Sequence, residues 1–147
     1  MLNQTVSKRV RLTLGGALFC AVAALGSFSN IAAAADVKVT LVGDQEVPPV
    51  KSAGTGSGTI VIENDGAVSG RVTTTGIAGT AAHIHEAAMG KNGPVIIPLT
   101  KNGDTYVVPP GAKLTEAQLA SFKEGNLYVN AHTTANPGGE IRGQLKP

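Results

Sequence analysis

After residue 36 the chain is a series of short runs in which apolar and polar residues alternate, separated by clusters of Gly, Asn, Asp and Pro. Side chains of a β-strand point to opposite faces in turn, so this period of two predicts half-buried strands. The runs cover residues 37–41, 59–63, 71–75, 81–86, 94–99, 105–108, 127–132 and 140–145. Many short strands with turn signals between them predict an all-β fold, an antiparallel Greek-key sandwich or barrel.

One helix is expected to interrupt this pattern. Thr115, followed three residues later by Gln118, forms the sequence signature of a capping box. Gly125 suits the left-handed position that commonly ends a helix. These signals predict a short helix near residues 116–124, lying across one end of the sheets.

Several connections between the runs carry turn signals. Asn64-Asp65-Gly66 predicts a hairpin, and Pro137-Gly138 predicts a type II turn with positive φ at the glycine. Residues 51–58, rich in Gly and Ser, are expected to form a flexible loop leading into a strand. Asp44 and Glu46 lie on a Pro-rich segment, where we expect solvated loop residues.

The first 35 residues differ from the rest. Three basic residues precede an uncharged, mostly apolar stretch from Leu12 to Phe28, and Ala33-Ala34-Ala35 offers a small-residue cleavage site before Asp36. This is the layout of a secretory signal peptide, residues 1–35. It predicts a periplasmic or secreted protein without stable membrane insertion after cleavage. An uncleaved membrane anchor is the alternative, since the apolar stretch approaches the length of a membrane span.

The remaining 112 residues, 36–147, are expected to form one domain. They hold all ten acidic residues and nine of the twelve basic ones, a net charge of −1. This balance argues against nucleic acid as a partner. The segment has no cysteine, so it offers neither a disulfide nor a thiolate ligand.

The three histidines of the chain lie on the predicted strands. His83 and His85 are two residues apart and therefore share one face, while His132 lies on the polar face of the run 127–132. A pair of neighbouring imidazoles with a third from another strand is a common arrangement for a transition metal. We expect a metal site at these three residues; the alternative is that they are ordinary polar residues on the strands.

Other residues are expected near this site. The two strands joined by residues 133–139 form a predicted hairpin, which brings Glu140 and Arg142 close to His132. Glu140 could orient an imidazole from outside the ligand set, and Arg142 could attract an anionic ligand. Met89 lies four residues after His85 and is a possible extra ligand, since a thioether favours Cu(I); its alternative role is to fill an apolar gap.

Three stretches of the chain resemble the CHRD domain, a module named after chordin and also found in exported bacterial proteins. The stretches are Gln45-Glu46-Val47-Pro48-Pro49-Val50, then Ala82-His83-Ile84-His85 with Gly93-Pro94-Val95-Ile96, and Tyr128-Val129-Asn130-Ala131-His132-Thr133 with Asn136-Pro137-Gly138-Gly139-Glu140-Ile141-Arg142-Gly143-Gln144-Leu145. The resemblance identifies residues 36–147 as one CHRD domain. Glu86-Ala87 departs from it, where a glycine is expected soon after the second histidine.

A second, local resemblance is to copper/zinc superoxide dismutases. His83-Ile84-His85-Glu86 is similar to their His-x-His-Glu segment, and residues 136–142 are similar to their closing segment, with a longer gap to the arginine. This resemblance implies that His83, His85 and His132 are copper ligands and that Arg142 attracts an anion. The chain lacks the dismutases' fourth histidine, zinc loop and disulfide, which puts dismutase activity in doubt.

The sequence therefore leaves three hypotheses open. The first is an exported domain that binds a transition metal, copper favoured, through the three histidines. The second is a module that binds an extracellular protein or polysaccharide, with structural histidines. The third is a weak redox enzyme of dismutase type. No complete catalytic machinery stands out, so a role in binding is favoured over one in catalysis.

Overall fold

The computed structural model describes residues 34–147. The predicted signal peptide lies outside the described residues, apart from Ala34 and Ala35 at its end. The elements are β1 (Ala35–Val42), η1 (Gly43–Gln45), β2 (Thr55–Ile62), β3 (Val68–Thr75), β4 (Gly79–Glu86), β5 (Val95–Pro98), β6 (Thr100–Asn102), β7 (Thr105–Val107), α1 (Glu116–Lys123), β8 (Leu127–Thr133) and β9 (Ile141–Leu145).

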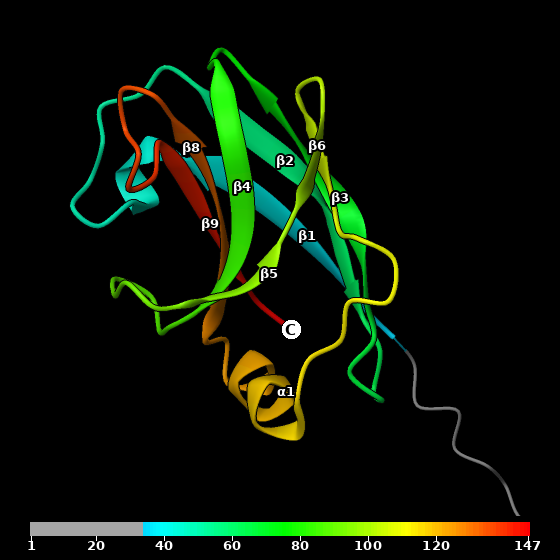
Figure 1. Cartoon of the computed structure of the whole chain (residues 1–147). Coiled ribbons are helices and arrows are strands. Elements are labelled where there is room, and N and C mark those ends of the chain that lie inside the picture. The colour runs from blue at the N-terminus through cyan, green and yellow to red at the C-terminus, as the bar shows by residue number, and fades with distance from the viewer. Residues whose placement is uncertain (1–33) are drawn as a thin grey trace, which may run out of the picture. The chain divides into compact units, whose positions relative to one another are not determined.

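The nine strands form one antiparallel sheet in the order β5-β4-β8-β9-β1-β2-β3-β7-β6. The first strand, β1, therefore lies between its hairpin partner β2 and the last strand, β9. The sheet curves so that β4, near one edge, approaches β6 at the opposite edge. This makes a nearly closed barrel (Figure 1). The predicted antiparallel all-β fold with one short helix is confirmed.

The barrel interior is filled by the apolar members of the alternating strands. In β1, Val37, Val39 and Leu41 are buried while the residues between them are exposed, as the pattern predicts. The fully buried side chains include Tyr106 and a set of aliphatic residues: Leu41, Ile60, Val72, Ile84, Leu127, Val129, Ile141 and Leu145. With no disulfide in residues 34–147, burial of this apolar surface is the main source of stability.

The helix and the hairpin of β2 and β3 have the predicted form. The side chain of Thr115 accepts a hydrogen bond from the backbone N–H of Gln118, and the Gln118 side chain accepts one from the backbone N–H of Thr115. Gly125 follows the helix with φ of +75°. Phe122 is buried against the core, and α1 lies at one end of the barrel (Figure 1). Gly66 has φ of +89° in the turn between β2 and β3.

Two local predictions are wrong, and one strand was not predicted. Residues 55–58 belong to β2, because their backbone pairs with both β1 and β3 and does not form a flexible loop. Strand β6 was not expected; its residues are all exposed and carry no alternation. In the turn before β9, positive φ falls on Gly139 (+140°) and not on Gly138. The Gly139 N–H donates to the carbonyl of Asn136 at 3.1 Å, so this is a type I turn.

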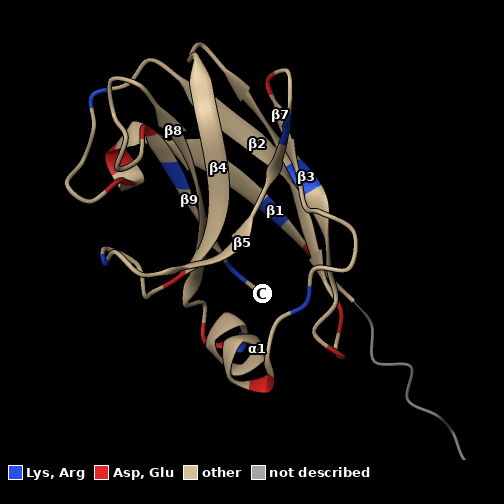
Figure 2. Cartoon of the chain, in the orientation of Figure 1, with Lys and Arg blue, Asp and Glu red and all other residues tan. Residues whose placement is uncertain are grey.

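The described part of the chain carries no concentrated charge of one sign. In Figure 2, basic and acidic residues are scattered over the strands and loops. Within residues 34–147, no helix has both the length and the apolar character needed to cross a membrane.

Candidate metal centre

The three histidines come together on the outer face of β4 and β8. These strands pair in an antiparallel register that places His83 opposite Asn130 and Ala81 opposite His132. His83 and His132 are therefore diagonal neighbours, and His85 follows two residues along β4. One ring nitrogen from each histidine lies within 4.8 Å of the others. The predicted convergence of His83, His85 and His132 is thus present in the structure.

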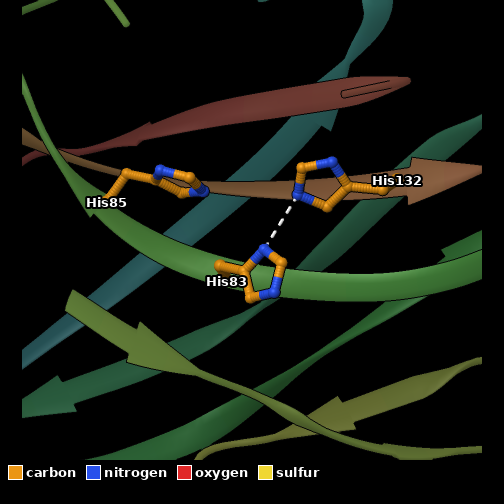
Figure 3. Close-up of side chains that lie close together, drawn as sticks. All are labelled: His83, His85 and His132. Carbon is orange, nitrogen blue, oxygen red and sulfur yellow. Dashed lines mark hydrogen bonds between the residues drawn. The ribbon is translucent and has the colours of Figure 1, made fainter. Parts of the chain in front are cut away.

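The closest contact within this trio joins His83 to His132. The Nδ1 atom of His83 lies 2.9 Å from Nε2 of His132, a hydrogen-bond distance (Figure 3). The ring centroid of His85 lies 5.6 Å from that of His83 and 6.3 Å from that of His132. In Figure 3 the Nε2 atom of His85, the ring nitrogen farther from the backbone, points toward the other two rings.

Backbone carbonyls fix two of the rings. His85 Nδ1 lies 2.9 Å from the carbonyl oxygen of Gly93, and His132 Nδ1 lies 3.0 Å from that of Pro137. A carbonyl oxygen only accepts, so both Nδ1 atoms carry a proton and donate it. In the neutral rings, each Nε2 atom then bears a lone pair and no proton. This is the arrangement in which proteins usually hold metal-binding histidines.

His85 presents a polar atom without a partner. Its Nε2 atom is buried and makes no hydrogen bond. A buried acceptor left unpaired costs free energy, so such an atom calls for an explanation. His132 Nε2, by contrast, accepts a hydrogen bond from His83 Nδ1. A ligand that bonds the lone pair of His85 Nε2 would account for the buried atom.

All three imidazoles favour the neutral form. Burial lowers the pKa of His83, and the neighbouring His132 and His85 lower it further. Burial also lowers the pKa of His85 and of His132, and the charge of Arg142 lowers both further. The hydrogen bonds to Gly93 and Pro137, and for His85 the neighbouring side chain of Asn130, oppose this effect. Neutral imidazole is the form that binds a metal. His83 is half-buried whereas His85 and His132 are buried, so the site opens to solvent on the side of His83.

A layer of polar residues continues from the histidines to β9. Tyr128 stacks on His85 with ring centroids 4.8 Å apart and planes 7° apart. Arg142 lies on β9, the strand on the other side of β8. Its guanidinium carbon is 4.0 Å from the centroid of the Tyr128 ring. Both side chains are almost completely buried. The polar face of β8 and β9 is thus a packed layer beneath loops.

Glu46 is part of this layer, and the expectation that it is a solvated loop residue is wrong. Its carboxylate is 3% exposed and accepts a hydrogen bond from Arg142 Nε at 3.0 Å. Arg142 Nη2 lies 2.9 Å from the same oxygen. Burial raises the pKa of Glu46, and the charge and hydrogen bonds of Arg142 oppose that effect. The segment after η1 therefore covers the sheet.

The other predicted site residues are Glu140, Arg142 and Met89. Glu140 Oε2 accepts hydrogen bonds from Thr133 and Asn136, and no described hydrogen bond joins it to a histidine. Arg142 touches Glu46 and the loop between β4 and β5. Met89 is 60% exposed and lines a surface hollow with Pro49 and Gln144. None of the contacts described for residues 34–147 joins Met89 to the trio.

A comparison with known protein families matches residues 37–145 to the CHRD domain. The chain belongs to the CHRD domain family. The match runs from β1 to β9 and so includes the whole barrel and all three histidines of this CHRD domain. No curated protein and no solved structure matches the chain. The resemblance to copper/zinc dismutases is not supported by these comparisons.

Proposed function

We propose that this CHRD domain binds one transition-metal ion through His83, His85 and His132. The buried, unpartnered Nε2 atom of His85 carries this proposal, because its lone pair points toward the two other rings. The carbonyl contacts to His85 and His132 support it, since they leave both Nε2 atoms free of a proton.

The spacing of the nitrogens fits a metal after a small rearrangement. With metal–nitrogen bonds of about 2.0 Å, ligand nitrogens lie roughly 3.3–3.6 Å apart in a tetrahedral or trigonal site. The ring nitrogens of the trio lie within 4.8 Å of one another, and the His83–His132 pair is at 2.9 Å. Binding would therefore separate His83 from His132 slightly and draw His85 inward. If Nδ1 of His83 is the ligand, its proton would move to Nε2 of the same ring, which stays neutral.

Copper is the metal that we favour. Three imidazoles without a thiolate or a carboxylate suit copper, zinc, iron or nickel, and among divalent ions copper binds such ligands most tightly. The absence of cysteine from residues 36–147 removes the thiolate ligands of many structural zinc sites. The role would then be copper storage, delivery or sensing.

A metal titration tests this function. Purified protein is titrated with Cu(I), Cu(II) and Zn(II), next to the triple variant in which all three histidines are alanine. We expect one equivalent of copper to bind the parent protein and no comparable binding to the triple variant. Met89→Ala is the matched control outside the trio, and we expect it to bind copper like the parent. Equal binding by the parent and the triple variant would refute the proposal.

Export belongs to the same proposal. Residues 1–35 have the composition of a signal peptide, so we expect the mature chain to begin at Asp36 in the periplasm or outside the cell. The mass of the protein recovered from the extracytoplasmic fraction tests this. A full-length mass in that fraction would contradict cleavage at this position.

A second candidate is a module that binds an extracellular protein or polysaccharide. The contacts that favour it are those between histidines and loop carbonyls, because they also tie the loops to the sheet. A purely structural role predicts that His132→Ala lowers the melting temperature of metal-free protein and that copper does not raise that of the parent. The metal site predicts that copper raises it.

Dismutase-type turnover is not part of the proposal. Arg142 directs four contacts to protein acceptors: Nε and Nη2 to Glu46, Nη1 to the Lys91 carbonyl and Nη2 to Asn92. A guanidinium held in this way has little capacity left for an incoming anion. A superoxide assay of copper-loaded protein is expected to give no more activity than free copper.

A further inference from the structure

The two carbonyls that orient the histidine rings belong to two different loops. Gly93 lies in the loop between β4 and β5, residues 87–94, and Pro137 lies in the turn between β8 and β9, residues 134–140. Each loop is anchored by one charged side chain, and the two side chains flank Ile141. Arg142 holds the first loop and Glu140 the second.

Arg142 fixes the loop 87–94 by two hydrogen bonds. Its Nη1 atom donates to the carbonyl of Lys91 at 3.0 Å, and its Nη2 atom donates to Oδ1 of Asn92 at 2.5 Å. The next residue is Gly93, whose carbonyl accepts from His85 Nδ1. A side chain at Gly93 would collide with the carbonyl of Glu86, 1.9 Å from an added Cβ, so the loop packs directly on β4.

The same guanidinium also acts on His85 through a stack of rings. It lies over one face of Tyr128, whose ring is parallel to that of His85. The hydroxyl of Tyr128 accepts a hydrogen bond from the N–H of Gly93 at 3.2 Å. Arg142 thus constrains both the carbonyl that holds Nδ1 of His85 and the plane of the His85 ring.

Glu140 fixes the turn on the other side. Its Oε2 atom accepts hydrogen bonds from the hydroxyl of Thr133, at 2.9 Å, and from the side-chain amide of Asn136. The Thr133 hydroxyl in turn accepts from the backbone N–H of Asn136 at 3.0 Å. The following residue is Pro137, whose carbonyl accepts from His132 Nδ1. A hydrogen bond with the Ser52 side chain, together with those from Asn136 and Thr133, keeps the pKa of Glu140 below its ordinary value.

We propose that Arg142 and Glu140 are separate positioning residues of the histidine site, Arg142 for His85 through Gly93 and Glu140 for His132 through Pro137. The orientation of each ring is independent of metal, whereas the consequence for metal affinity rests on the proposed function. Losing a group that orients a ligand from outside the coordination sphere typically costs about 10–100-fold in metal affinity.

Two matched variants test the separate roles of Arg142 and Glu140. Arg142→Lys keeps the charge beside Glu46, but an ammonium cannot reach Glu46, Lys91 and Asn92 together. Glu140→Ala removes the acceptor for Thr133 and Asn136. The tautomer of each histidine and the exchange rate of its Nδ1 proton are measured by nitrogen NMR on metal-free, full-length protein, and copper affinity is measured in parallel.

We expect Arg142→Lys to mix the tautomers of His85 and speed exchange of its Nδ1 proton by tenfold or more, while His132 keeps its signals. Glu140→Ala should do the reverse. Each variant should bind copper about 10–100-fold more weakly than the parent. If Arg142→Lys does not fold, Asn92→Ala replaces it, because that exposed side chain joins the loop to Arg142.

Variants that leave their own ring unchanged, or that disturb both rings equally, would overturn the proposal. The same experiment excludes a role of Arg142 through its charge alone if Arg142→Lys, which keeps the charge, still disturbs the His85 signals. If the NMR result is as expected and the parent protein binds no metal, the positioning roles stand and the proposed function fails.

Discussion

The guanidinium of Arg142 and the carboxylate of Glu46 meet 2.9 Å apart in the interior of the polar layer, although 96 residues separate them in the chain. Each side chain is 3% exposed. The pair connects β9 to the segment that follows η1, and Arg142 continues from there to the loop 87–94. Arg142 therefore links two covering segments to the sheet that carries the histidines.

Breaking this pair is expected to destabilise the fold strongly. Glu46→Gln leaves the buried charge of Arg142 without its counter-charge, and we expect the free energy of unfolding to fall by about 3–5 kcal/mol. The double variant Glu46→Gln/Arg142→Met removes both charges and should lose less. Urea unfolding measures both. A double variant at least as unstable as Glu46→Gln would contradict this account of the pair.

Stability of the metal-free protein should decrease on mild acidification. Burial lowers the pKa of His83, His85 and His132 in the folded state, so the unfolded chain binds protons first as the pH falls. Their contribution is complete above the ordinary histidine pKa of about 6.5 and is lost as the pH falls below that value toward the folded pKa values.

Urea unfolding of the parent and of a triple His→Gln variant between about pH 7.5 and pH 5 checks this prediction. The difference between the two proteins isolates the histidines, which matters because the raised pKa of Glu46 acts in the opposite direction. The stability that Glu46 contributes is complete below its ordinary pKa and is lost as the pH rises through its folded value. A parent–variant difference that does not change with pH would count against neutral buried histidines.

A methyl group at Gly93 should weaken metal binding without touching a ligand. The Cβ of Gly93→Ala would lie 1.9 Å from the Glu86 carbonyl, so the loop must move and take the Gly93 carbonyl away from His85. We expect copper affinity to drop by about tenfold or more. Gly138→Ala is the control, because a Cβ there meets nothing within 4 Å. Equal copper affinities for the two variants would show that the loop does not orient His85.

Removing the hydroxyl of Tyr128 should loosen the same loop. Tyr128→Phe keeps the ring that stacks on His85 but leaves the N–H of Gly93 without its acceptor, which is expected to cost about 1 kcal/mol. Hydrogen exchange at the Gly93 amide should become faster, while exchange at Val129 in the core stays slow. Unchanged protection at Gly93 would mean that another group holds the loop.

The parts of the site that depend on alternation were predictable from sequence. The period of two places His83 and His85 on one face of β4 and His132 on the same side of β8, and the hairpin of β8 and β9 follows from the turn between them. The capping box of Thr115 with Gln118 was also predictable, because its residues are close neighbours in the chain.

The segments that cover the site could not be predicted from local sequence patterns. Glu46 and Asn92 reach Arg142 across 96 and 50 residues, and nothing in their own segments distinguishes them from solvated loop residues. Glu140 was expected to orient an imidazole from outside the ligand set, and in the structure it accepts hydrogen bonds from Thr133 and Asn136 in the neighbouring turn. The signal available for Glu46 was not a local pattern: it lies in residues 45–50, one of the stretches that resemble the CHRD domain.

The coordination of bound copper is the most direct test of a three-histidine centre. X-ray absorption at the copper edge of the loaded protein should show three nitrogen neighbours at about 2.0 Å with the outer-shell scattering of imidazole rings. The same measurement on His85→Ala should show one imidazole fewer. Copper bound mainly by oxygen, or a spectrum unchanged by His85→Ala, would contradict the site built from His83, His85 and His132.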